Sequence, residues 1–304
     1  LNGLPGLLGS SLSETLELKR LCQFFLESLD GLHIEDEEIP IFFELSEFIK
    51  ELTLSMETEA DPTALWHKVA DAKEHYRLRI RNGIEGQEIL LKITDIKVFL
   101  KAIVDRCRKA TEHARTPDGL LSTYFYHEVV DYALLDKKHQ GLSCVLPISF
   151  KRHDLPLFLE GIVHVLKAEH EQKHARQIYE RLRKSSLFDR KLKMYKVNAD
   201  LSSQSEEIGR TRIFPRGWLE NESVWLHMQY KYLLEVLRSG LFAEFYQTFK
   251  EVLIPFSNPA VYGRSILENS SFIVSSAHED KNLHGQGFVA RLSGSTAEFL
   301  QLWL

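Results

Sequence analysis

The chain has 304 residues, of which 44% are hydrophobic and 27% are charged, and its formal net charge is −5. This length and composition are those of a globular protein with a sizeable core, and they exclude disorder as a class. Lys and Arg are spread along the chain, so no basic surface for nucleic acid is indicated. No stretch approaches the roughly 18 consecutive apolar residues that a membrane span needs. We therefore expect neither nucleic acid nor a membrane as a partner.

The three cysteines, Cys22, Cys107 and Cys144, are far apart and odd in number. They form neither a metal-binding spacing nor a disulfide framework, which favours a reducing compartment, and we expect the cytoplasm. His170 and His174 are four residues apart, but the surrounding helix is highly charged. We expect them to be an exposed pair, with no metal site.

Both ends of the chain are expected to continue into further sequence. The chain opens at Leu1 without an initiator Met or a signal-peptide pattern. It stops at Leu304 in an apolar helical run that has no C-cap glycine. We expect the remainder of the same polypeptide to be a partner, and a homodimer stays open.

The hydrophobic periodicity is mostly helical. Ser13 is a plausible N-cap for the first helix, and Asp61-Pro62 is typical of an N-cap followed by Pro at the first helical position. In chain order, helices are expected over Glu14–Leu29, Glu37–Met56, Asp61–Arg81, Gln87–His113, Pro156–Lys167, His170–Ser185, Trp218–Gly240 and Leu241–Leu253.

Three segments are not helical in their pattern. The aromatic and β-branched residues of 120–150 indicate extended structure, 191–217 are loop-like, and 255–294 are irregular. Long helices joined by substantial loops, without alternation of strands and helices, predict an all-α array of helical hairpins. No repeat of fixed period and no low-complexity linker is present, so a single domain over 1–304 is expected.

The segment Trp218–Gly240 is apolar almost all round, which predicts a buried helix. Glu220, His227 and Lys231 are spaced by seven and four residues and would share one face of it. Buried charge is costly unless it is paired or faces a polar cavity. The stripe is therefore either the wall of a substrate cavity or an internal network that satisfies itself.

Two further segments carry polar groups suited to ligands. Arg264–Phe272 combines side-chain donors and acceptors with aromatics, which suits sugar hydroxyls or a hydrogen-bonded loop that shapes the fold. Arg291–Thr296 places small hydroxyl residues at a helix start, which can hold an anion or simply cap the helix. Glu14, near another helix start, is either a dipole-stabilising residue or a proton donor at a cavity rim.

The run Leu219–His227, with Glu220-Asn221-Glu222 near its start, resembles the Glu-Asn-Gly-Gly motif of glycoside hydrolase family 94, the cellobiose and chitobiose phosphorylases. Further matches follow the same order along the chain, and the last third is the most specific. They are Pro147-Ile148-Ser149-Phe150 for Asn-Pro-Gln-Ser-Trp before a helix, Glu268-Asn269-Ser270-Ser271-Phe272 for Glu-Pro-Tyr-Val, and Ser293-Gly294-Ser295 for Thr-Gly-Thr.

This resemblance implies an (α/α)6 barrel, of which the chain would supply roughly the second half. It also implies that His227, Ser293 and Gly294 bind inorganic phosphate, together with an Arg from upstream. Glu220 matches a sugar-site residue, and the neighbouring positions that we expect to contact sugar are Glu222, Trp225, Glu268 and Asn269.

The general acid of the family lies in Gly-Asp-Trp-Asn-Asp-Gly after a Gly-Leu-Pro stretch. Here Gly3-Leu4-Pro5 is followed by Gly9-Ser10-Ser11-Leu12-Ser13-Glu14, so the signature is absent. Glu14 is the carboxylate nearest to the position of the acid. We therefore expect Glu14 to be catalytic.

The leading hypothesis is inverting phosphorolysis of β-linked gluco-oligosaccharides, without a cofactor and with inorganic phosphate as co-substrate. An inverting glycoside hydrolase would need a second carboxylate, for which Glu220 and Glu222 are candidates. A catalytically inactive helical domain that binds glycan or acts as a scaffold is the third hypothesis.

Overall fold

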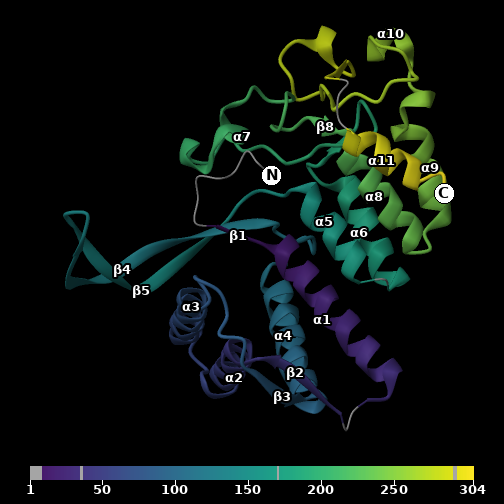
Figure 1. Ribbon diagram of the computed structural model, residues 1–304. Helices are drawn as coiled ribbons and strands as arrows, with labels where there is room; N and C mark the ends of the chain where they lie inside the picture. The colour runs from purple at the N-terminus through teal and green to yellow at the C-terminus, as the bar shows by residue number, and fades with distance from the viewer. Residues whose placement is uncertain (1–8, 35–36, 170, 290–292) are drawn as a thin grey trace. The chain divides into compact units, whose positions relative to one another are not determined.

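The computed structural model describes residues 9–34, 37–169, 171–289 and 293–304 (Figure 1). Its contacts divide the chain into two compact units, each built from separate stretches of sequence. Unit 1 contains the described residues of 1–17, 111–127 and 152–304, and unit 2 contains those of 18–110 and 128–151. That the whole chain is one domain stays a prediction.

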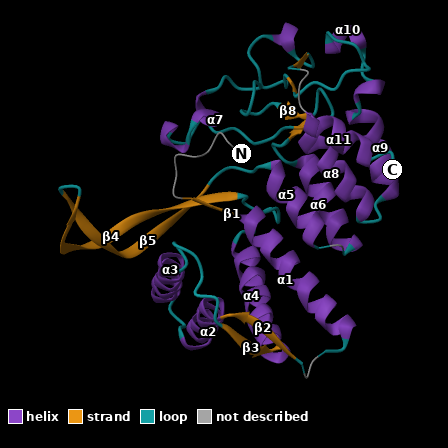
Figure 2. Cartoon of the chain, in the orientation of Figure 1, coloured by secondary structure: helices purple, strands orange, loops and turns teal. Residues whose placement is uncertain are grey.

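Helices and short strands alternate along the described residues, and the strands form four small sheets (Figure 2). The expectation of an all-α partial (α/α)6 barrel is therefore wrong: the fold is mixed α/β. Two of the sheets have three strands, in the orders β1-β4-β5 and β10-β9-β8, and two are pairs, β2-β3 and β6-β7.

Two of the expected helices begin with strands instead. Strands β2 (Glu38–Phe42) and β3 (Glu88–Lys92) are antiparallel, with Ile39 opposite Leu91. Pro40 disfavours a helix interior, and the alternation of exposed and half-buried residues in β2 is that of a strand. Helices α2 (Phe43–Thr58) and α4 (Ile93–His113) consequently start six residues later than the periodicity predicts.

In unit 2, α2 packs against α3 (Pro62–Arg79). The rings of Phe48 and Tyr76 stack between these helices with centroids 4.7 Å apart. The predicted cap of α3 is confirmed, because the Asp61 carboxylate accepts a hydrogen bond from the amide of Ala64 at 2.8 Å. Cys22 and Cys107 are buried thiols.

The expected extended segment forms the two longest strands, β4 (Tyr124–His139) and β5 (Leu142–Asp154). Gln140 and Gly141 join them, both with positive φ, as two-residue hairpin turns require. The Pro147–Phe150 segment lies within β5, so it does not precede a helix as its family counterpart does. Strand β1 (Gly9–Ser11) pairs with the start of β4, where Ser11 is opposite Tyr124.

Unit 1 has its core between helices. Helix α8 (Leu226–Arg238) contacts α5 (Leu159–Ala168), α9 (Phe242–Val252) and α11 (Ser293–Gln301), and α6 (Gln172–Lys184) contributes to the same core. Each fully buried Leu, Ile or Val side chain there stabilises the fold by roughly 1.5–3 kcal/mol. Among those fully buried are Leu159, Ile162, Ile178, Leu182, Leu233 and Val236.

Most short elements of unit 1 lie in the segments that the sequence pattern marks as loop-like or irregular, but β8 lies within the expected helix Trp218–Gly240 and β6 just before residue 191. The short elements are β6 (Phe188–Asp189), β7 (Met194–Tyr195), η1 (Glu206–Ile208), α7 (Arg210–Ile213), β8 (Val224–Trp225), η2 (Ile254–Phe256), α10 (Pro259–Tyr262), β9 (Phe272–Ile273), η3 (Lys281–Leu283) and β10 (Gly287–Phe288).

Helix α8 begins eight residues later than predicted. Trp218 and Asn221 form an isolated bridge, and Leu219 and Glu222 have φ values of 48° and 56°. Backbone in this left-handed region ends any helix, and non-glycine residues adopt it only rarely. Glu220 therefore lies in a turn before α8 and shares no helix face with His227.

Within the described residues, no helix is both long and apolar enough to cross a membrane.

Candidate functional site

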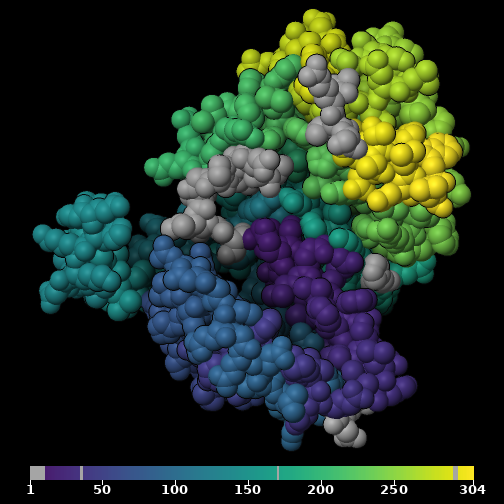
Figure 3. Space-filling model, in the orientation of Figure 1, coloured from purple at the N-terminus to yellow at the C-terminus, as the bar shows by residue number. Residues whose placement is uncertain are grey.

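Two strands of the sheet β10-β9-β8 precede helices in the chain: β8 precedes α8, and β10 precedes α11. Strand β8 runs directly into α8, and the amide of Leu226 at that junction donates to the carbonyl of Ser271 at 3.2 Å. Strand β10 precedes α11 in the chain, and α11 packs against α8. The outer side of α11, yellow in Figure 3, is at the surface, where Leu300 is exposed.

Two of the predicted phosphate-binding residues lie together at these helix starts. A Cβ atom added to Gly294 would lie 3.9 Å from the Cβ of His227. The first turn of α11 thus packs against the first turn of α8, and backbone N–H groups at a helix start favour an anion. Ser293 begins α11, but its side chain lies outside the described part.

The imidazole of His227 is half-buried and has spare hydrogen-bonding capacity. Its Nδ1 atom is buried and has no hydrogen-bond partner among the described residues. The Trp225 ring meets it edge-on, with centroids 5.5 Å apart. Burial, followed by the positive charge of Lys231, lowers the pKa of His227 from 6.5 to about 4, while the Glu160 carboxylate acts in the opposite direction. His227 is therefore neutral at pH 7, with one N–H donor and one acceptor.

Glu160, in the first turn of α5, receives a hydrogen bond from the hydroxyl of Tyr124, the first residue of β4. Burial is the main cause that raises the pKa of Tyr124, and the carboxylates of Glu160 and Glu14 add to it. The sequence pattern marks neither Tyr124 nor Glu160 as a site residue. The only signal for Glu160 is an acidic residue near a helix start, which the helix dipole explains equally well.

Glu14 lies in the first turn of α1 (Leu12–Leu32) and is exposed. The helix starts earlier than predicted: Ser11, and not Ser13, caps it, since the Ser11 hydroxyl accepts from the Ser13 amide at 3.0 Å. The amide of Leu12 donates to the carbonyl of Thr123 at 2.8 Å. This bond and the Ser11–Tyr124 register bring the first turn of α1 to the start of β4, so the structure brings Glu14 close to Tyr124.

The predicted polar stripe is broken up. Glu220 pairs with Arg210, with both nitrogen–oxygen distances at 3.4 Å. The Nζ of Lys231 lies 3.7 Å from a carboxylate oxygen of Glu298 on α11. The prediction that Glu220 lies on the same helix as His227 and Lys231 is therefore wrong, while His227 and Lys231 both lie on α8.

Glu222 is part of a buried ion network. It is 1% exposed, and its carboxylate accepts from Lys196 Nζ at 2.6 Å and from Arg216. Its own amide donates to the Asn198 side chain at 2.7 Å. Arg216 also lies 3.2 Å from Asp200. All these contacts hold the turn before α8, and they leave Glu222 little capacity for a sugar.

The remaining predicted sugar-binding residues also have protein partners. The Tyr230 hydroxyl donates to Asn269 Oδ1 at 2.7 Å, and Trp225 Nε1 donates to the carbonyl of Leu219 at 2.6 Å. Glu268 is exposed, 3.4 Å from Arg264 Nε. Asn269 and Trp225 thus help to shape the loops around the start of α8, and their contact with a sugar stays a prediction.

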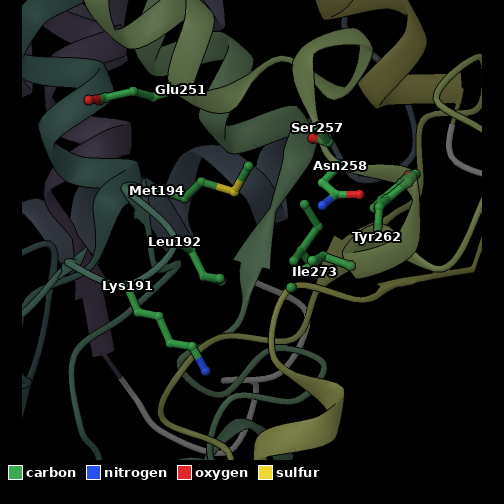
Figure 4. A pocket seen from close by; sticks show the side chains of 10 residues that line it. Lys191, Leu192, Met194, Glu251, Ser257, Asn258, Tyr262 and Ile273 are labelled. Carbon is green, nitrogen blue, oxygen red and sulfur yellow. The ribbon is translucent and has the colours of Figure 1, made fainter.

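A separate cavity of about 210 Å³ lies elsewhere in unit 1 and contains none of the predicted site residues. In Figure 4, Asn258 and Tyr262 lie on one side of it and Leu192 and Met194 on the other. Its acidic residue, Glu251, is engaged with Arg183 at 3.0 Å. None of the residues lining this cavity belongs to the group around His227, so the cavity is not part of the candidate site.

In the part of the chain that the structure describes, no three His, Cys, Asp or Glu side chains are grouped as metal ligands. His174 lies 3.1 Å from Glu169 and 3.5 Å from Arg115. His170 lies outside the described residues, so the pair expected from the sequence is not described as a whole.

No protein-family model matches the sequence, and no curated protein is significantly similar to it. The resemblance to glycoside hydrolase family 94 therefore stays a prediction based on short motifs.

Proposed function

We propose that the chain carries the phosphate-binding and acid groups of an enzyme that cleaves β-linked gluco-oligosaccharides by inverting phosphorolysis. The observation that supports this most is the packing of Gly294 against His227, because the sequence resemblance selects this pair although the residues are 67 positions apart.

The chemistry of the two helix starts suits phosphate. The first turn of α11 supplies backbone N–H groups, and neutral His227 supplies a ring N–H without the cost of a buried positive charge. Lys231, 43% exposed and on the same helix as His227, adds positive charge nearby. A dianion held there would be bound mainly by dipoles, with the charge of Lys231 shared between it and Glu298.

The proposed reaction uses Glu14 as the general acid. Glu14 gives its proton to the glycosidic oxygen while the C1–O bond breaks, and a phosphate oxygen forms the new bond to C1 from the opposite face. The products are α-glucose 1-phosphate and the shortened sugar. No second protein carboxylate is needed, since phosphate takes the place of the activated water.

Incubation of the purified protein with cellobiose, with and without inorganic phosphate, tests the proposal. We expect release of glucose 1-phosphate only when phosphate is present. Release of reducing sugar without phosphate would instead support the inverting hydrolase, and binding without turnover would support an inactive glycan-binding domain. Either result would contradict phosphorolysis.

A further inference from the structure

Three chain segments of unit 1 meet at the start of β4. Strand β1 pairs with the start of β4, and α1 begins at the next residue after β1. The first turn of α1, which contains Glu14, therefore lies beside the start of β4. The Thr123 hydroxyl donates to the carbonyl of Phe158 at 3.0 Å and accepts from the amide of Gly161 at 3.1 Å, which fixes the first turn of α5 with Glu160. Tyr124, the next residue after Thr123, thus comes close to both carboxylates.

The hydrogen bond between Tyr124 and Glu160 is not required to join these elements. Thr123 already connects β4 to α5 by two hydrogen bonds, one on each side of its hydroxyl. Tyr124 and Glu160 are both half-buried. A half-buried tyrosine hydroxyl usually has a hydrogen-bond partner, and here the partner is an ionisable carboxylate and not a backbone carbonyl. The Tyr124–Glu160 pair therefore suggests a role beyond the fold.

The direction of this hydrogen bond determines what else the Tyr124 hydroxyl can do. A tyrosine hydroxyl has one proton, and here it is donated to Glu160. The lone pairs of the hydroxyl oxygen can then only accept, and the charge of Glu14 acts on this hydroxyl. A protonated carboxyl group is a donor, so Glu14 in its acid form is a suitable partner.

We propose that Tyr124, oriented by Glu160, is a positioning residue that holds the proton-bearing carboxyl of Glu14 toward the glycosidic oxygen. This inference rests on the proposed function. The proton moves from Glu14 to the leaving oxygen, while the Tyr124 proton stays on its hydroxyl and remains directed at Glu160. Misplacement of a catalytic group by about 1 Å can cost on the order of 100-fold in rate.

The test compares two donors, each with inorganic phosphate: cellobiose, whose leaving group needs a proton, and β-glucosyl fluoride, whose fluoride leaves without one. We expect Glu14→Gln, Tyr124→Phe and Glu160→Gln to lower kcat for cellobiose. The expected loss is about 100-fold or more for Glu14→Gln and about 10–100-fold for the other two. All three should turn over the fluoride within about 3-fold of the unmodified protein, as loss of acid catalysis alone predicts.

Tyr126→Phe is the matched control, because Tyr126 lies on the same strand and packs on the same small core cluster as Tyr124. It should leave kcat for both donors unchanged. An equal loss on both donors for Tyr124→Phe would mean a structural role and would overturn the inference. Loss of fluoride turnover in Glu160→Gln would assign Glu160 to the displacement step and would also overturn it.

A second measurement separates this inference from the proposed function. Thermal unfolding midpoints of Tyr124→Phe, Glu14→Gln and the double variant form a cycle that needs no activity. At pH 4, where a larger share of exposed carboxyl groups carries a proton, we expect the two shifts to be non-additive. Additive shifts would contradict a Tyr124–Glu14 contact, whereas absence of turnover in the unmodified protein would contradict the proposed function.

Discussion

Glu222 and His227 stand five residues apart, and their surroundings are opposite. Glu222 is buried with two cations on its carboxylate and an amide partner on its backbone, which leaves it little capacity to bind a ligand. His227 keeps a buried ring nitrogen without a partner in the described residues. At His227 a ligand could complete this spare capacity, whereas the carboxylate of Glu222 is engaged by its neighbours.

The largest effect should come from Glu222. Replacing it by Gln leaves the cations of Lys196 and Arg216 without their shared counter-charge, and Lys196 is only 12% exposed. We expect a loss of about 3 kcal/mol in the free energy of unfolding, as for other buried ion pairs that lose one partner. Urea denaturation followed by circular dichroism measures it. A loss under about 1 kcal/mol would show that this network is no essential part of the fold.

The lowered pKa of His227 should make the free energy of unfolding depend on pH. Its pKa is about 4 in the folded protein against 6.5 for an ordinary histidine. Between these values the unfolded chain binds a proton that the folded protein does not, so stability should fall by about 1–3 kcal/mol from pH 6.5 to pH 4. His227→Gln should remove this part of the slope. An identical pH profile for the variant and the unmodified protein would show that His227 titrates normally.

The smallest effect should come from Glu220, because its pair with Arg210 is long at 3.4 Å and Arg210 is 55% exposed. Glu220→Gln should change the free energy of unfolding by less than about 1 kcal/mol. A much larger loss, comparable with that of Glu222→Gln, would erase the distinction between the two glutamates. Parallel denaturation of both variants gives this comparison directly.

Periodicity located most helices of the chain but not their starts. Strands β2 and β3 were missed because short segments with apolar residues at the start of a helical pattern satisfy both periods. Pro40 argues against a helix at β2, whereas at β3 the pairing between 38–42 and 88–92 selects the strand. The start of α8 was missed because Leu219 and Glu222 adopt positive φ without being glycines. No local sequence signal announces that conformation at these residues.

Residues of the candidate site could be predicted from the sequence only where motifs of one family occur at positions far apart in the chain. The ordered resemblance selected His227 and Gly294, and the packing of α8 on α11 brings them together. Glu160 could not be found in this way, because it lies in the first turn of α5, as a dipole-stabilising residue would. Its link to Tyr124 depends on the β4–α5 arrangement, which single-sequence reasoning does not supply.

The most direct test of the central claim is phosphate binding by isothermal titration at pH 7 to the unmodified protein and to His227→Gln. We predict that the unmodified protein binds inorganic phosphate and that the variant binds about 10–100-fold more weakly, as expected for loss of a hydrogen bond to a charged group. Glu220→Gln, the matched control, should bind as the unmodified protein does. Equal affinity of the His227→Gln variant and the unmodified protein would contradict the assignment of His227 and the start of α11 as the phosphate site.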